Sequence, residues 1–197
     1  MVIDISQNVL SCAVYPGDPS PQLQRLSRME DGALYNLSSF SMCAHNGTHI
    51  DAPAHFFADG KTVGDLDLSA CIGDCYVTRY PGALSADAAE GICSAAGALG
   101  CSARILLAGG TVVTEDAAAV FVRRGVRLIG VDSQSVGPLD APMAVHKILL
   151  FAEVVLLEGL VLNHVADGRY FLSAVPLNLG VAEGAPCRAV LLTQEET

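Results

Sequence analysis

From about residue 86 onward the chain alternates between helix-forming and strand-forming segments, and this alternation constrains its fold most strongly. Ala86–Leu99 is rich in alanine and predicts a helix, and the apolar run Arg104–Leu107 predicts a strand. A second helix is expected to begin after Thr114, a suitable N-cap, and to end near Gly125, before the apolar strand Arg127–Val131. Such alternation is typical of parallel strands that are covered by helices.

The rest of the sequence adds shorter elements, with no repeats, low-complexity tracts or charged linkers. A third helix is expected from Pro142 to about Leu150, and a turn at Pro16–Pro19. The further strand candidates are Val2–Ile5, Val9–Val14, Leu37–Ala44, Cys75–Arg79, Val154–Leu162, Tyr170–Val175 and Arg188–Leu192. We therefore expect one α/β domain over residues 1–197, built on a mixed sheet.

The composition excludes several classes of protein. Hydrophobic residues make up 51% of the chain and charged residues 16%, which excludes intrinsic disorder. The longest apolar run, Ile148–Leu157, contains Glu153 and is too short to span a membrane. The net charge is −10, and the only adjacent basic pair is Arg123-Arg124. Because nucleic acids and anionic membranes bind clustered cations, we expect neither as a partner, and small substrates remain.

The N-terminus and the cysteines favour a reducing compartment. Met1–Ser6 contains Asp4 and no basic side chain, so no signal peptide is expected. Seven cysteines are irregularly spaced and form no C-x-x-C pair: Cys12, Cys43, Cys71, Cys75, Cys93, Cys101 and Cys187. A disulfide-stabilised secreted protein is typically smaller and more regular, so we expect reduced, mostly buried thiols and a cytoplasmic location.

One segment, residues 45–55, concentrates the chemistry of the chain. Gly47 and Pro53 disfavour a continuous helix there, and the residues between them favour an extended chain. In an extended chain residues of the same parity face the same side. Four polar residues share odd numbers and are expected on one face: His45, His49, Asp51 and His55.

Imidazole and carboxylate groups together are suited to a divalent metal such as Zn²⁺, Mn²⁺ or Fe²⁺. Three such ligands leave room for water, as in catalytic rather than structural zinc sites. His45 and His49 have the spacing of the helical metalloprotease motif, but Asn46 stands where that motif needs Glu. The alternative is that these are surface or hydrogen-bonded core histidines.

The segment matches H-x-G-T-H-x-D-x-P-x-H at all seven fixed positions and thereby resembles the metal-dependent cyclase family, which includes bacterial kynurenine formamidases and isatin hydrolases. Other segments that resemble the family are Tyr15–Asp18, Thr114–Ala119, Arg124–Ser133, Leu157–Leu160, Gly168–Leu177 and Pro186–Val190. The resemblance implies a swivelling β/β/α fold with a barrel-like core and flanking helices.

The resemblance also implies roles for individual residues. His45, His49 and Asp51 are expected to bind one metal, and His55 to act as general acid/base. In the formamidase branch Asp51 and Glu158 bind a second metal together with His146. Zn²⁺, one or two ions per subunit, is the expected cofactor, with Mn²⁺ as an alternative.

The sequence around the last two candidate ligands bears on these roles. Glu158 lies in an apolar strand, where an unpaired carboxylate is costly to bury, so either a cation partner or an exposed strand edge is expected. Lys147 directly follows His146, which favours a single-metal site as the alternative. His164 matches nothing in the family pattern and is expected in a loop.

A metal-dependent hydrolase of C–N amide bonds is the activity that the resemblance implies. N-formylkynurenine is the first expected substrate and a cyclic amide such as isatin the second. A non-catalytic metal-binding homologue and a lyase with the same metal centre are the alternatives. Tyr15, Phe56 and Phe57 are candidate aromatic residues at the substrate, although the formamidases typically have Trp in place of Tyr15. A homodimer or homotetramer is expected, with Tyr15–Pro21 reaching into the partner subunit.

Overall fold

Nine strands form one mixed β-sheet in residues 1–193, which are the residues that the computed structural model describes. In spatial order they are β1 (Val2–Asp4), β13 (Val190–Leu192), β11 (Gly168–Ser173), β5 (Ile72–Arg79), β7 (Arg104–Ala108), β9 (Leu128–Val131), β10 (Val155–Glu158), β4 (His49–Asp51) and β12 (Gly184–Pro186). The central strands β5, β7, β9 and β10 run parallel, whereas the outer strands pair antiparallel. The predicted α/β class with a mixed sheet is confirmed.

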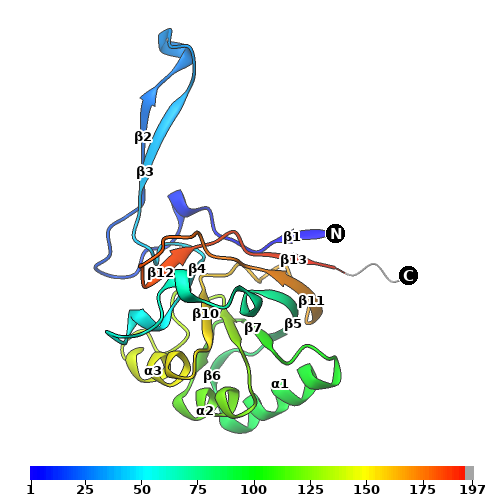
Figure 1. Ribbon diagram of the computed structural model, residues 1–197. Coiled ribbons are helices and arrows are strands. Elements are labelled where there is room, and N and C mark those ends of the chain that lie inside the picture. Colours follow the sequence, from blue (N-terminus) through cyan, green and yellow to red (C-terminus); the bar gives the residue numbers. More distant parts are fainter. Residues whose placement is uncertain (194–197) are drawn as a thin grey trace.

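Three helices lie together on one side of this sheet (Figure 1). They are α1 (Ala86–Ala98), α2 (Glu115–Arg123) and α3 (Met143–Phe151). The side chains of Ser85 and Thr114 accept hydrogen bonds from the backbone N–H groups of Ala88 and Ala117, and these caps fix where α1 and α2 begin. A short parallel pair, β6 (Gly82–Leu84) and β8 (Thr111–Val113), precedes these two helices and was not predicted.

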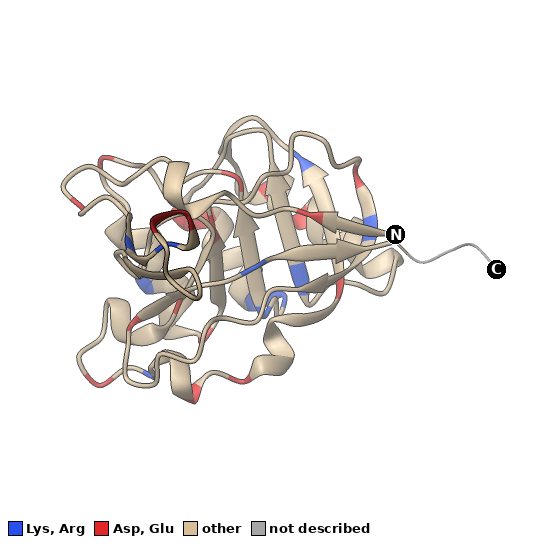
Figure 2. Ribbon diagram, turned by 90° about the horizontal axis from the view of Figure 1, so that it is seen from above, with Lys and Arg blue, Asp and Glu red and all other residues tan. Residues whose placement is uncertain are grey.

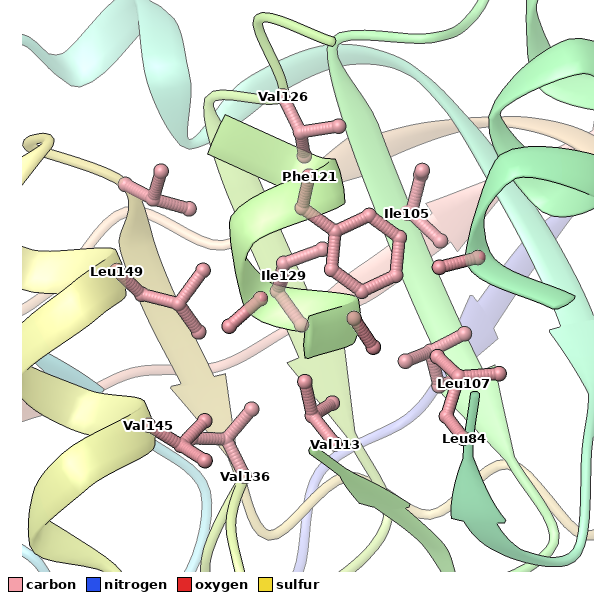
Figure 3. Packing of buried hydrophobic residues seen from close by; sticks show 14 of the residues in the cluster. Leu84, Ile105, Leu107, Val113, Phe121, Val126, Ile129, Val136, Val145 and Leu149 are labelled. Atoms are coloured by element: carbon pink, nitrogen blue, oxygen red, sulfur yellow. The ribbon is translucent and has the colours of Figure 1, made fainter. Parts of the chain in front are cut away.

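Apolar side chains are buried on both faces of the central strands. Ile105 and Leu107 of β7 face the helices, where they pack around the fully buried Phe121 of α2 (Figure 3). Leu106, between them, faces the opposite side and joins a second cluster that includes Leu191 of β13. Because central and outer strands contribute to this second cluster, the sheet curls over its own core, as the barrel-like expectation requires.

Local structure corrects two predicted strands. Val9–Val14 was expected to be extended, but Val9–Ser11 forms a 3-10 turn, since the Asn8 side chain accepts a hydrogen bond from the N–H of Leu10. The predicted extended segment over residues 45–55 is also wrong outside β4. Gly47 has a φ of +69° in a turn before β4, and Pro53–His55 forms a 3-10 turn after it.

A hairpin of β2 (Gln22–Ser27) and β3 (Leu37–Ser41) projects from the body of the protein as an arm (Figure 1). The sequence pattern indicated β3 but not β2. The arm exposes large hydrophobic side chains on and between its strands: Leu23, Leu26, Met29, Leu34, Tyr35, Leu37 and Phe40. Because an isolated two-stranded hairpin is only marginally stable in water, this exposed apolar surface is unusual for a monomer.

Within residues 1–193, no helix has the length and apolar character needed to cross a bilayer. Lys and Arg lie on several separate elements (Figure 2). All seven cysteines are free thiols, and four of them are buried, as expected. Burial raises the pKa of Cys75 and of Cys187 to about 12 and that of Cys71 to about 11.

Candidate metal centre

Two strands, a helix and a turn bring the predicted ligands together at one end of the sheet. β4 carries His49 and Asp51, and β10 pairs with it antiparallel so that Glu158 lies directly opposite His49. Directly opposed residues of an antiparallel pair share a face, so both side chains point to the same side. α3 adds His146 from its second turn, and the turn before β4 adds His45. The structure therefore brings all five predicted ligands to one place.

Asp51 stands at the centre of this cluster, with its two oxygens facing different histidines. Oδ1 lies 2.8 Å from His45 Nδ1 and 3.4 Å from His49 Nε2. Oδ2 lies 3.7 Å from His146 Nε2. The donor atoms thus form two groups, each within 4.8 Å: His45, His49 and Asp51 in one, and Asp51, His146 and Glu158 in the other.

Glu158 contributes the second carboxylate of the cluster and contacts two of its histidines. Its Oε1 lies 3.2 Å from His146 Nε2, and its Oε2 lies 3.6 Å from His49 Nε2. The backbone N–H of Val136 donates a hydrogen bond of 2.8 Å to Oε1 and fixes the carboxylate. Glu158 is 3% exposed, so the alternative of an exposed strand edge is wrong.

Backbone carbonyls set the orientation of two of the imidazole rings. His49 Nδ1–H donates to the carbonyl of Gly47 at 3.0 Å, and His146 Nδ1–H donates to that of Pro142 at 2.8 Å. These bonds fix the proton on Nδ1, so Nε2 of each ring is directed at the carboxylates. Without a proton or a metal ion, an Nε2 lone pair would face carboxylate oxygens and be repelled.

Burial and neighbouring charges shift the pKa values of the residues in this cluster. Burial alone raises the pKa of Asp51, but hydrogen bonds from His45 and His49 outweigh it and hold that pKa well below its usual range. Burial and the negative charge of Asp51 raise the pKa of Glu158, but hydrogen bonds from His146 and His49 outweigh them and hold that pKa below its usual value. Burial lowers the pKa of His49, yet the two carboxylates raise it well above the ordinary value. Two buried carboxylates therefore need positive charge beside them.

These residues fit a divalent cation. His45 Nε2 is buried and has no hydrogen-bond partner, its nearest charged group being Glu183 at 3.4 Å. Nitrogen and oxygen donors without thiolate are suited to borderline-to-hard divalent ions. A cation shared by these donors would balance both carboxylates and occupy the Nε2 lone pairs.

His55 lies beside the cluster but outside both donor groups. The 3-10 turn Pro53–His55 places its ring against that of His45, with centroids 4.2 Å apart, and 6.2 Å from that of His146. Burial lowers the pKa of His55, which favours the neutral ring that can accept a proton.

The cluster opens into a cavity of about 260 Å³. Phe56 lines it and lies edge-on against His55, with ring centroids 4.5 Å apart. Tyr15 lines it as well, and its hydroxyl donates a 3.0 Å hydrogen bond to the carbonyl of Leu139. Phe57 is not among the residues that line the cavity and instead contacts Phe151, with ring centroids 5.9 Å apart. His164 lies exposed in a turn, as expected.

The cavity also has lining residues that the sequence analysis missed. Asp18 and Cys43 lie on it, as do Gln134 and Ser135. Gln134 and Ser135 follow β9. Because ligands of parallel sheets bind beyond the carboxyl ends of the strands, the polar residues after Arg127–Val131 could have indicated from sequence that this segment lines the site. Asp18 was noted only as part of a turn.

Comparison with known proteins agrees with this geometry. A family model described as "Putative cyclase" matches residues 3–138. A kynurenine formamidase of Bacillus anthracis is 37% identical over 96% of this chain and 96% of its own length. A structure described as a potential metal-dependent hydrolase with cyclase activity is 27% identical, with a TM-score of 0.79, over 99% of this chain and 98% of that one. An isatin hydrolase bound to thioisatinate has a TM-score of 0.82 at 20% identity, over 98% of this chain and 92% of that one, a likeness in fold alone.

Proposed function

The chain belongs to the cyclase family, and from this premise we propose that it is a metal-dependent kynurenine formamidase, which hydrolyses N-formylkynurenine to kynurenine and formate. The observation that carries the proposal is the buried cluster of five nitrogen and oxygen donors at the floor of a cavity, with His55 beside it. The Bacillus anthracis relative, 37% identical along nearly its whole length, supports this substrate. Isatin is the weaker candidate, because its hydrolases are similar in fold at about one fifth identity.

His45, His49 and Asp51 would hold one metal ion, and Asp51, His146 and Glu158 a second. We propose Zn²⁺, with Mn²⁺ as the alternative, because both accept imidazole and carboxylate ligands. A divalent cation at such a site supplies Lewis-acid chemistry, which polarises a carbonyl oxygen and makes water more acidic.

The protein's own groups perform the proton transfers. The neutral ring of His55 accepts a proton from the attacking water while the oxygen of that water bonds to the formyl carbon. When the C–N bond breaks, the same ring returns the proton to the departing aryl nitrogen, which leaves as the amine, and the second product is formic acid, which loses its proton to solvent as formate. Phe56 and Tyr15 present aromatic surface to the aryl ring of the substrate, which keeps the formyl group over the cluster.

The test combines metal analysis with hydrolysis. Protein purified without added metal is assayed for its metal content by elemental analysis and for hydrolysis of N-formylkynurenine and of isatin. We expect hydrolysis of the formamide, loss of that activity after dialysis against a strong chelator, and its recovery with Zn²⁺ or Mn²⁺. Full activity in metal-free protein would refute the mechanism, and preference for isatin would refute the proposed substrate.

We further propose a homodimer or homotetramer in the cytoplasm. The arm of β2 and β3, with Leu34 92% exposed and Phe40 63% exposed, supports association with a second copy of the chain. The free thiols of all seven cysteines support a reducing compartment. Light scattering at micromolar concentration tests the assembly, and a monomer would contradict it.

A further inference from the structure

One turn presents an aromatic ring and a carboxylate to the cavity from its two ends. The backbone N–H of Asp18 donates a 3.0 Å hydrogen bond to the carbonyl of Tyr15, and Gly17, between them, has a φ of +100°. Pro16 followed by a glycine with positive φ is the sequence that a type II turn requires. Tyr15 and Asp18 both line the cavity, so the turn sets the ring and the carboxylate at a fixed separation.

Two hydrogen bonds connect the side chains at the ends of this turn to other segments of the chain. The Tyr15 hydroxyl donates to the carbonyl of Leu139, in the segment between β9 and α3. The Cys43 thiol donates to Asp18 Oδ2 with a sulfur–oxygen distance of 3.6 Å, which is a weak hydrogen bond. In the described part of the chain, this thiol is the one side chain that donates to the Asp18 carboxylate.

The carboxylate of Asp18 takes no part in the metal centre. Glu158, the other carboxylate residue lining the cavity, is occupied by His146 and by the Val136 N–H. Asp18 belongs to neither donor group. Among the described residues that line the cavity there is no Lys or Arg, so the charged end of a substrate meets an anion here rather than a cation.

We propose that Asp18 is a specificity residue that binds the ammonium group of an aryl formamide with an amino-acid side chain, while Tyr15 packs against the aryl ring of that substrate. This inference rests on the proposed function and narrows it to aryl formamides whose ring side chain carries a cationic amine. A half-buried carboxylate with one weak donor gains a charge-assisted hydrogen bond from such an ammonium group. A neutral aryl formamide has no ammonium group and therefore forms no such hydrogen bond with Asp18.

The experiment compares two formamides in two variants of the metal-containing protein. N-formylkynurenine carries the ammonium group and the carboxylate of an amino acid, and N-(2-acetylphenyl)formamide keeps the same aryl ketone without either. Asp18→Asn removes the charge with little change in shape. Asp87→Asn is the matched control, because it removes one negative charge from α1, which lies away from β4 and β12 (Figure 1).

We expect Asp18→Asn to raise KM for N-formylkynurenine about tenfold, the size of one charge-assisted hydrogen bond, and to leave kcat/KM for the neutral formamide unchanged. Asp87→Asn should change neither. An equal loss on both substrates, or no loss on either, would overturn the inference.

A binding measurement separates this inference from the proposed activity. Calorimetry measures the affinity for kynurenine and for 2-aminoacetophenone, and so tests the contact between Asp18 and the ammonium group without turnover. Asp18→Asn should weaken binding of kynurenine alone. If the wild-type protein hydrolyses neither formamide, the proposed function fails, while a selective loss of kynurenine binding still supports the ammonium site. If wild-type protein binds both amines equally, the inference fails.

Discussion

Gly184 provides a test of the metal centre in which no ligand residue is itself substituted. It lies in β12 opposite Asp51, and a Cβ atom added there would lie 2.6 Å from Cε1 and 3.0 Å from Nε2 of His45. Carbon atoms in contact are normally about 3.5–4.0 Å apart, so Gly184→Ala forces the ring of His45 to move by about 1 Å. Metal–ligand distances in proteins hold to within about 0.2 Å, and a shift of that size removes His45 from the first donor group.

We expect Gly184→Ala to weaken metal binding about 10- to 100-fold, as happens when the groups that orient a ligand are lost. Competition with a chromophoric chelator measures the dissociation constant, and circular dichroism of the metal-free protein checks that the fold is kept. Gly91→Ala is the control, because no atom lies within 4 Å of a Cβ there. His45→Ala sets the loss expected when the ligand is removed entirely. An unchanged dissociation constant in folded Gly184→Ala would refute the assignment of His45 as a ligand.

Three further predictions concern His55, Tyr15 and the buried thiols. His55→Ala should keep its metal but lose about 10²- to 10⁴-fold in kcat, whereas His49→Ala should lose metal; an emptied site in His55→Ala would contradict its acid/base role. Tyr15→Ala should raise KM for aryl formamides at unchanged metal content, and unaltered kinetics across several of them would remove Tyr15 from the site. Cys71 and Cys75 are fully buried and have pKa values of about 11 and 12, so both are almost entirely protonated at pH 8, and iodoacetamide should leave them unmodified in native protein and alkylate them in urea. Rapid alkylation of either in native protein, read by mass spectrometry, would show that the burial is wrong.

Local patterns were enough to predict the layered core. Arg104–Leu107 and Arg127–Val131 are apolar on both faces, and such strands have to be covered on both sides, as β7 and β9 are. Ser85 and Thr114 cap their helices through bonds that span three residues, so the starts of α1 and α2 depend on nearby sequence alone. The types of metal ligand in residues 45–55 were likewise fixed by local composition, because imidazole and carboxylate chemistry does not depend on the fold.

The geometry of the site depended on contacts that are remote in sequence. His45 reaches the cluster through the turn at Gly47, not through the alternation of an extended chain, so its placement was expected for the wrong reason. Glu158 meets His49 because β10 pairs with β4 in one register, and a slip by one residue would turn the carboxylate to the other face. That register is set by the packing of the whole sheet.

The direction of the arm and the placement of the Asp18 carboxylate also depend on tertiary structure. Nothing in the local sequence of Gln22–Ser27 says that its hairpin points away from the sheet (Figure 1). Asp18 was identified from sequence as part of the turn Pro16–Pro19, and only the tertiary fold puts its carboxylate on the cavity beside the donor cluster. Sequence thus determined which side chains have the required chemistry, because that property belongs to each residue. The fold determined which of them meet, because strand pairing and loop closure depend on the rest of the chain.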